Sequence, residues 1–145
     1  MTSTVLPAIT RFAETDRADL IALWEVCGLI RPWNDPDKDI DRKLGDAAGL
    51  FLVARQDGVL IGSAMAGYDG HRGSVNYLAV HPDHRHTGLG RRFMAEIEAA
   101  LTAWGCPKIN LMVRRSNTDV THFYEKLGYQ QDDVVVLGKR LISDL

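Results

Sequence analysis

The stretch that decides the fold is Tyr77-Leu-Ala-Val-His-Pro-Asp-His-Arg-His-Thr-Gly-Leu-Gly-Arg-Arg-Phe-Met94. Its first residues predict a strand that ends at His81-Pro82, and residues 85–90 predict a glycine-bearing loop that opens a helix. The free amides and the positive dipole end of a helix start attract an anion, and glycines let a phosphate approach the backbone closely. Positive charge at this loop comes from Arg85, Arg91 and Arg92. The stretch therefore predicts a phosphate-binding loop.

Two common kinds of phosphate-binding loop do not fit these residues. A nucleotide-hydrolysing P-loop has a Lys followed by Ser or Thr after its last glycine, whereas Gly90 is followed by Arg91-Arg92. A dinucleotide-binding loop has a third glycine, which the Gly88-Leu89-Gly90 segment lacks. The loop thus belongs to neither class.

The composition indicates one neutral-to-acidic globular domain over residues 1–145. Hydrophobic residues make up 46% of the chain, which is enough to form one sizeable core. The 17 Lys and Arg residues stand against 19 Asp and Glu residues, so the chain has no broad basic surface. We therefore expect no nucleic acid partner.

The cysteines and the apolar runs indicate a cytoplasmic protein. Cys27 and Cys106 lie far apart and match no zinc or redox spacing, which favours a reducing compartment. The longest apolar run, residues 50–54, is far too short to span a membrane, and residues 1–6 show no signal-peptide pattern. We expect neither a membrane anchor nor a signal peptide.

The apolar periodicity predicts a mixed sheet flanked by helices. Helices are expected from a cap at Thr15 or Asp16 to Gly28, over 36–47, from 89 to Gly105 and over 120–127. Strands are expected over 8–12, 50–56, 59–68, 74–80 and 108–113, with a final strand or hairpin over 129–141. The order β-α-α-β-β-β-α-β-α-β-β defines an α/β (α+β) fold. Trp24 and Trp104 lie on apolar helix faces and are expected in the core.

Two segments resemble signatures of one enzyme superfamily. The pattern Arg85-x-x-Gly88-x-Gly90, after a strand that ends Leu78-Ala79-Val80-His81-Pro82, resembles motif A of the GCN5-related N-acetyltransferases (GNAT). Asn117, followed by residues 123–129, resembles the second signature of that superfamily, and the order of elements matches its fold over nearly the whole chain. Residues 31–36, 68–73 and 105–107 resemble more narrowly the small bacterial YpeA-type acetyltransferases.

The resemblance implies an acyltransferase that uses acetyl-CoA and no metal. Main-chain groups of the strand end are implied to bind the pantetheine and the thioester carbonyl, and these belong to Leu78, Ala79 and Val80. The pyrophosphate is implied to lie on the loop, against Arg85, His86, Thr87, Gly88, Leu89, Gly90 and Arg91. Asn117 and Tyr124 complete the implied coenzyme contacts, and Tyr124 is also the implied general acid. A phenol with a pKa near ~10 can protonate a departing thiolate.

The general base is left open. Several members of the superfamily carry a Glu at the start of the motif A strand, but Ser74-Val75-Asn76-Tyr77 contains no carboxylate. Deprotonation of the acceptor amine can pass through water or use a group from another element. The candidate groups are Glu25, Asp35, Asp69 and His71.

The acceptor is expected to be a primary amine, on either a small molecule or a protein or peptide. The loop that contains Trp33 borders the acceptor pocket in this superfamily, so Trp33, Glu25 and Asp69 are candidate acceptor residues, although Trp33 packing against the sheet is an equal alternative. Acidic residues such as Asp37 and Asp39 suit a cationic amine, or simply cap a helix.

Several simpler alternatives stand beside these interpretations. Tyr124 also fits an ordinary core aromatic, and Asn117 fits a helix cap. The loop histidines 81, 84 and 86 have no accompanying Cys and no i, i+4 pair, so we expect no metal site. A non-catalytic acyl-CoA-binding or regulatory module on the same fold is the alternative function, and a nucleotide-binding protein is a more distant one. Edge strands of the C-terminal hairpin leave a homodimer open.

Overall fold

The Asp57-Gly58 dipeptide closes the hairpin at the centre of the sheet. In the computed structural model, which describes residues 5–145, both residues have positive φ, 53° and 82°, as a tight hairpin turn requires. The turn joins β2 (Leu50–Gln56) to β3 (Val59–Tyr68), which pair antiparallel from Leu50↔Ala66 to Gln56↔Val59. Residues 1–4, part of the N-terminal stretch expected to hold no signal peptide, lie outside the described residues.

Three further strands complete the mixed sheet that the sequence predicts. These are β1 (Ala8–Arg11), β4 (Gly73–Val80) and β5 (Ile109–Asn110), and the sheet order is β1-β2-β3-β4-β5. All neighbours are antiparallel except β4 and β5, which are parallel and pair only at Gly73↔Ile109 and Ser74↔Asn110. Beyond these two pairs, β4 has no strand partner on its β5 side among residues 5–145.

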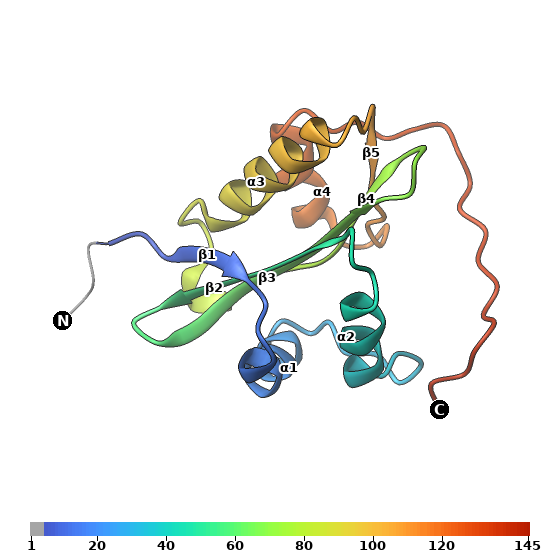
Figure 1. The fold of residues 1–145 in the computed structure, drawn as a ribbon. Helices are drawn as coiled ribbons and strands as arrows, with labels where there is room; N and C mark the ends of the chain where they lie inside the picture. Colours follow the sequence, from blue (N-terminus) through green and yellow to red (C-terminus); the bar gives the residue numbers. More distant parts are fainter. Residues whose placement is uncertain (1–4) are drawn as a thin grey trace.

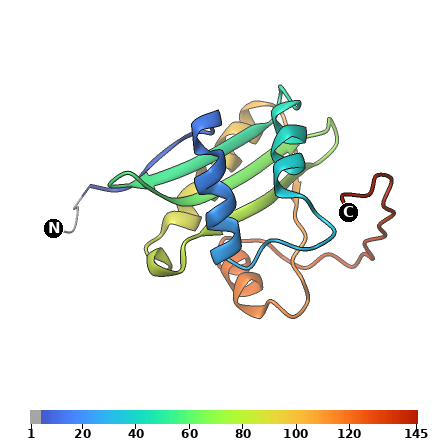
Figure 2. The ribbon, with the colours of Figure 1, turned by 90° about the horizontal axis from the view of Figure 1, so that it is seen from below.

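Helices cover both faces of the sheet. Figure 1 shows α1 (Arg17–Val26) and α2 (Pro36–Leu44) below the sheet, and α3 (Leu89–Ala103) and α4 (Thr118–Lys126) above it. In Figure 2, seen from below, α1 and α2 cross in front of the strands. Short 3₁₀ turns, Glu14–Asp16 and Pro82–His84, precede α1 and the loop before α3.

Successive side chains of β2 point alternately into two halves of the core, one on each face of the sheet. Leu52 packs in the half that contains Phe93 of α3, whereas Phe51 and Val53 pack in the half that contains Trp24 of α1. The alternation follows because successive strand side chains point to opposite faces, so a strand covered on both sides is apolar throughout.

The prediction of a strand or hairpin over 129–141 is wrong. No strand lies beyond β5 in residues 5–145, because the backbone of 130–141 has no hydrogen-bonded neighbour. The predicted strand 108–113 shortens to Ile109–Asn110 for the same reason, and the second helix ends at Leu44, before Gly45, rather than at 47. Trp104 is 41% exposed, since it follows the last residue of α3 and lies beyond the buried helix face.

A bulge in β4 is held by a chain of buried hydrogen bonds. Tyr77 has φ of 51°, and the register between β3 and β4 shifts between Ser63 and Met65. The Trp24 indole Nε1 donates to Ser63 Oγ at 3.0 Å, and Ser63 Oγ donates to the Tyr77 carbonyl at 2.8 Å. The Trp24 and Tyr77 rings stack with centroids 3.9 Å apart. These contacts position the bulge one residue before Leu78.

We expect Ser63→Ala to lower the free energy of unfolding by about 1–3 kcal/mol, because the change removes the partner of both the buried Trp24 N–H and the Tyr77 carbonyl. Denaturation in urea measures the loss. Ser74→Ala, at an exposed serine of β4, is the control and is expected to stay within about 0.5 kcal/mol of the parent. Equal stabilities of the two variants would contradict the role of Ser63 in holding the bulge.

Candidate active site

The predicted phosphate-binding loop has the geometry of an anion site. Loop residues His86 and Gly88 have φ of 63° and 87°, and Gly88 is the N-cap of α3. The first helical bond runs from the Arg92 N–H to the Gly88 carbonyl at 3.1 Å, so the N–H groups of residues 89–91 have no acceptor among the described residues. Three backbone donors therefore remain at the positive end of the α3 dipole.

The second glycine of the loop allows two helices to touch. A Cβ atom built on Gly90 would lie 3.1 Å from Cζ of Phe123, which is closer than most real Cβ contacts. Phe123 of α4 thus packs against the start of α3. The need for glycine at position 90 is thus steric, whereas at position 88 it is the left-handed backbone.

The three arginines of the loop have different environments. Arg85 and Arg91 are exposed, and Arg85 Nε lies 3.5 Å from the carbonyl of Val80. Arg92 is half-buried, and its Nη1 is buried without a hydrogen-bond partner among the described residues. A buried guanidinium nitrogen that lacks an acceptor is an observation that fits an anionic ligand.

The strand end before the loop lies outside regular pairing. Tyr77 and Leu78 oppose no residue of β3 in the register, which resumes at Ala79 and Val80. On the other side β5 reaches only Gly73 and Ser74. The bulge therefore leaves a backbone segment beside a gap in the sheet, at the position where the sequence predicts pantetheine contacts.

Tyr124 is a buried phenol at the wall of a cavity. The residue is 7% exposed, and its ring contacts Phe123 and Tyr129 edge-on at 5.0 and 5.5 Å. Burial raises the pKa of Tyr124 to about 12. Its hydroxyl makes no hydrogen bond to any residue from 5 to 145, so a protonated hydroxyl is available to a ligand at neutral pH.

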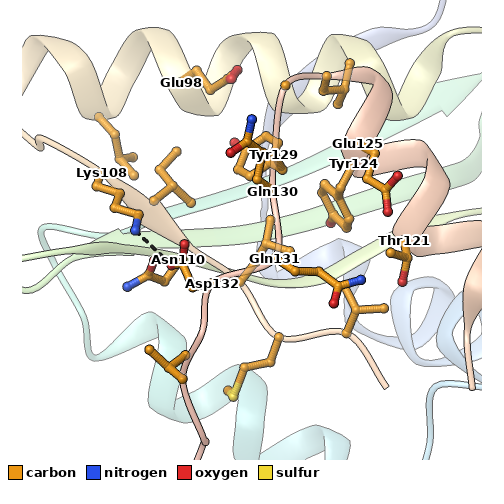
Figure 3. Close-up of a pocket in the computed structure, with 18 of the residues that line it drawn as sticks. Glu98, Lys108, Asn110, Thr121, Tyr124, Glu125, Tyr129, Gln130, Gln131 and Asp132 are labelled. Atoms are coloured by element: carbon orange, nitrogen blue, oxygen red, sulfur yellow. Dashed lines mark hydrogen bonds and ion pairs between the residues drawn. The ribbon is translucent and has the colours of Figure 1, made fainter. Parts of the chain in front are cut away.

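The cavity beside Tyr124 is separate from the predicted coenzyme groove. It has a volume of about 1070 Å³ and lies between the end of α3, β5, α4 and residues 127–136 (Figure 3). Of the residues predicted to contact the coenzyme, only Tyr124 lines it. Lys108 and Asp132 form an ion pair of 2.8 Å on its wall.

Asn117 occupies the N-cap position of α4 without capping it. Its side chain makes no capping hydrogen bond, although its carbonyl accepts from the Thr121 N–H at 3.2 Å. The exposed amide of Asn117 is thus left for other contacts, as its predicted coenzyme role requires.

The candidate acceptor residues lie on different elements. Trp33 is 45% exposed. The guanidinium carbon of Arg114 lies 5.8 Å from the centroid of the Trp33 ring, and this contact joins the loop 31–36 to the loop before α4. Glu25 is exposed on α1. Asp69 accepts the His71 and Arg72 amides in the β3–β4 turn, and these bonds lower the pKa of Asp69. Asp69 lies before the start of β4, and the length of β4, roughly 25 Å, separates it from the predicted phosphate-binding loop.

Sequence reasoning missed the contact between Tyr77 and Asp39. The Tyr77 hydroxyl donates to Asp39 Oδ2 at 2.6 Å, and Asp39 Oδ1 accepts from Arg42 at 3.1 Å. Burial, with the adjacent Asp39, raises the pKa of Tyr77 well above its ordinary value. No local pattern could reveal this contact, because it depends on how α2 docks on the bulged strand.

Comparisons with known proteins identify the class of this fold and site. The family model of the acetyltransferase (GNAT) family matches residues 14–129. An acetyltransferase of Yersinia pestis (strain Pestoides F) is 53% identical over 92% of this chain and 94% of its own length. An acetyltransferase of Sodalis glossinidius is 54% identical over the same shares of the two chains. The chain therefore belongs to the GNAT acetyltransferase family, and its class of activity is acetyl transfer.

Solved structures agree with this fold. The aminoglycoside N-acetyltransferase AAC(6')-Iy, in complex with a bisubstrate analog, has a TM-score of 0.78 at 19% identity, covering 95% of this chain and 100% of that one. The ribosomal-protein-S18-alanine N-acetyltransferase from Escherichia coli has a TM-score of 0.75 at 24% identity, covering 88% and 79%. The predicted GNAT fold is confirmed. No helix in the described part of the chain is long and apolar enough to cross a membrane.

Cys27 offers a chemical probe of this site. Its Sγ donates to the Val80 carbonyl at 3.4 Å; burial raises the pKa of the thiol, and the charge of Arg85 partly opposes this rise. In a Cys106→Ser background we expect iodoacetamide to modify Cys27 several-fold more slowly at neutral pH than free cysteine, with a rate that increases with pH.

Arg85→Gln is expected to slow this reaction further, because it removes the charge that lowers the pKa of Cys27. Arg91→Gln is the matched control and is expected to leave the rate unchanged. An Arg85→Gln rate equal to that of the parent would contradict the assigned effect of Arg85.

Proposed function

We propose that the protein is an acetyl-CoA-dependent N-acetyltransferase that transfers the acetyl group directly to a primary amine. Acetyl-CoA supplies an acetyl group on a thioester, whose carbonyl carbon is open to attack by a neutral amine. The observation that carries the proposal is the arrangement along one edge of β4. Unbonded α3 amides lie at its end, the bulge lies beside the gap, and Phe123, which precedes Tyr124 in α4, packs against the start of α3.

The loop and α3 fit the pyrophosphate of the coenzyme. Residues 86–91 present their backbone to an anion, and the free N–H groups of residues 89–91 donate to phosphate oxygens. The unpartnered Nη1 of Arg92, with exposed Arg85 and Arg91, adds positive charge beside the loop. Two structures of AAC(6')-Iy are complexes with CoA, which supports the same use here.

The bulged strand fits the reacting thioester. Leu78, Ala79 and Val80 supply main-chain hydrogen bonds to the pantetheine and to the thioester oxygen. A backbone donor held in place by the bulge stabilises the negative charge that this oxygen gains during attack, without reorganisation of solvent. Ser63 and Trp24 support this donor from the opposite face of the sheet.

Tyr124 supplies the proton to the departing thiolate. When the amine nitrogen bonds to the carbonyl carbon, the carbon–sulfur bond breaks and the sulfur takes the proton of the Tyr124 hydroxyl. The raised pKa keeps the phenol protonated at neutral pH, and Asn117 joins the coenzyme contacts beside it.

The acceptor amine loses its proton through water. Asp35 caps α2, Asp39 binds Tyr77 and Arg42, and Asp69 holds a turn, so these carboxylates already have partners. Trp33 and exposed Glu25 remain candidate acceptor contacts. Small-molecule amines and peptide amines are both acceptor classes for the test.

A second candidate function is a non-catalytic acyl-CoA-binding or regulatory module. The observation that favours it is the absence of a carboxylate from β4, together with the partners of the nearby aspartates. Incubation with acetyl-CoA and a panel of polyamines, amino acids, aminoglycosides and peptides separates the two functions. Chromatographic detection of CoA supports the enzyme, whereas tight acetyl-CoA binding without CoA release from any amine contradicts it.

Once an acceptor is found, Tyr124→Phe is expected to reduce kcat by about 10²–10⁴-fold, because the proton donor is lost. Tyr68→Phe is the control and is expected to keep full activity, because within residues 5–145 the Tyr68 hydroxyl bonds only the Gly70 carbonyl of a turn. With a pKa of about 12 for Tyr124, the rate should not fall between pH 8 and 10 through its ionisation. A Tyr124→Phe rate equal to the parent would exclude Tyr124 as the acid.

Gly88→Ala is expected to weaken CoA binding about tenfold, because a side chain costs about 1–2 kcal/mol in the left-handed conformation that the loop requires. Isothermal titration calorimetry measures the affinity. Gly70→Ala carries comparable strain, with φ of 95° and no atom near its Cβ, but lies in the β3–β4 turn. It is expected to leave the CoA affinity unchanged; equal losses in both variants would argue against the loop as the pyrophosphate site.

A further inference from the structure

The loop between α1 and α2, residues 28–35, is anchored at both ends to the bulged end of β4. Directly before the loop, Cys27 Sγ donates to the Val80 carbonyl at 3.4 Å. Beyond its other end, Asp39 of α2 accepts from the Tyr77 hydroxyl at 2.6 Å. The loop thus borders the face that α1 and α2 cover, whereas α3, whose free amides are proposed to bind the pyrophosphate, covers the other face (Figure 1). An acceptor that meets the thioester from the face opposite α3 therefore passes this loop.

Trp33 joins the loop to the chain that follows β5. The guanidinium carbon of Arg114 lies 5.8 Å from the centroid of the Trp33 ring. On β4, only Gly73 and Ser74 pair with β5, so the two strands have separated before the bulge. The loop is anchored to β4 on one side of this separation, and Arg114 lies beyond β5 on the other side. The contact between Trp33 and Arg114 thus spans the separation on the face that α1 and α2 cover.

Three arginines without a carboxylate partner meet at this loop. Arg31 Nη1 donates to the Gly28 carbonyl at 2.8 Å, and Arg140 Nη2 donates to Asn34 Oδ1 at 2.8 Å. Arg114 contacts the loop through the indole ring alone. None of the three forms an ion pair with any residue from 5 to 145. Their positive charges are therefore available to a ligand.

The carboxylates of α2 do not balance this charge. Asp37 and Asp41 both bind Arg17, at 3.2 and 2.7 Å, and Asp39 binds an arginine one turn further along α2 at 3.1 Å. Exposed Glu25 of α1 forms no ion pair within the described chain, and its single charge stands against three guanidinium groups. The acidic residues that would suit a cationic amine thus already have cationic partners, and the loop keeps an excess of positive charge.

We propose that the acceptor is a small molecule that carries an anionic group, a carboxylate or a phosphate, in addition to its primary amine. This inference rests on the proposed acetyl transfer, leaves its bond changes as described above, and names the class of acceptor. Arg114 and Arg31 bind the anion, because a guanidinium group presents planar N–H donors that match two oxygens of a carboxylate or phosphate. The exposed ring of Trp33 packs against the part of the acceptor between its two charged groups.

CoA release from paired amines tests the acceptor class. The pairs are glycine, β-alanine and γ-aminobutyrate, each with its amide, and glucosamine 6-phosphate with glucosamine; spermidine and kanamycin represent polycationic amines. At least one anionic amine is expected to have a kcat/KM about tenfold or more above that of its uncharged partner, since hydrogen bonds to charged groups are among the stronger ones. The carboxylate and phosphate pairs show which anion is preferred. CoA release from the polycationic amines alone would overturn the inference and leave acetyl transfer intact, and equal values within every pair would do the same.

Arginine variants test the residues assigned to the anion. Arg114→Gln is expected to raise the KM of the preferred anionic amine about tenfold, and Arg31→Gln several-fold, with the KM of acetyl-CoA unchanged. Arg114→Glu is expected to reverse the preference within the pair, which a loss of packing alone would not do. The matched control is Arg11→Gln, an exposed arginine without an ion pair in the described chain, on β1 at the opposite edge of the sheet. Circular dichroism checks that each variant is folded.

Two results with these variants would contradict the assignment. An unchanged KM of the anionic amine in both Arg114→Gln and Arg31→Gln would overturn it, and so would weaker acetyl-CoA binding, which would assign the arginines to the coenzyme.

If no amine releases CoA, isothermal titration of the same anionic amines into CoA-saturated protein separates the two failures. Binding that Arg114→Gln weakens would retain the acceptor class and reject acetyl transfer. No binding of any anionic amine would overturn both.

Discussion

The hydrogen-bonded chain from Trp24 through Ser63 to the Tyr77 carbonyl is the constraint on which the rest of the site depends. A bulge in the middle of a sheet leaves backbone groups out of the ladder, and such groups need partners when buried. Here a serine hydroxyl supplies the partner, and an indole in turn fixes the hydroxyl. Because Trp24 belongs to α1, these contacts tie that helix to the bulged strand.

The bulge in β4 also links the loop before α3 to helix α2. The backbone of Leu78 lies next to the region where β4 and β5 no longer pair, and the same strand continues into the phosphate loop. On the opposite face, Tyr77 binds Asp39 and so links α2 to the strand. The bulged strand and helix α2 are thus joined through a single residue.

Local sequence patterns predicted the turns and helix faces that are specified by residues close together in the chain. Asp57-Gly58 specified its hairpin because both residues tolerate positive φ, and the α1 stripe of Leu20, Leu23 and Trp24 is buried as its spacing indicates. The free amides at the start of α3 belong to the same group, because they follow from helix geometry alone. Apolar periodicity also predicted the order of elements through α4, and this order matches the GNAT fold.

Features that depend on distant partners escaped prediction. The role of Tyr77 requires Ser63 and Trp24, which are far away in the sequence, and a bulge leaves no mark on residue spacing. The apolar run Val134–Leu137 has strand composition, but a strand exists only where another backbone bonds to it, so composition alone misassigned it. For the acceptor residues, the sequence could name candidates but not their distances, because they lie on separate elements.

The three tryptophans give the molecule an internal set of optical probes. Trp24 is fully buried, hydrogen-bonded and stacked on Tyr77, whereas Trp33 and Trp104 are 45% and 41% exposed. Emission from a buried indole lies at shorter wavelength than emission from one in water, and water-soluble quenchers reach it poorly. The blue component of the fluorescence therefore reports on the strand that carries Leu78, and the red component reports on the surface.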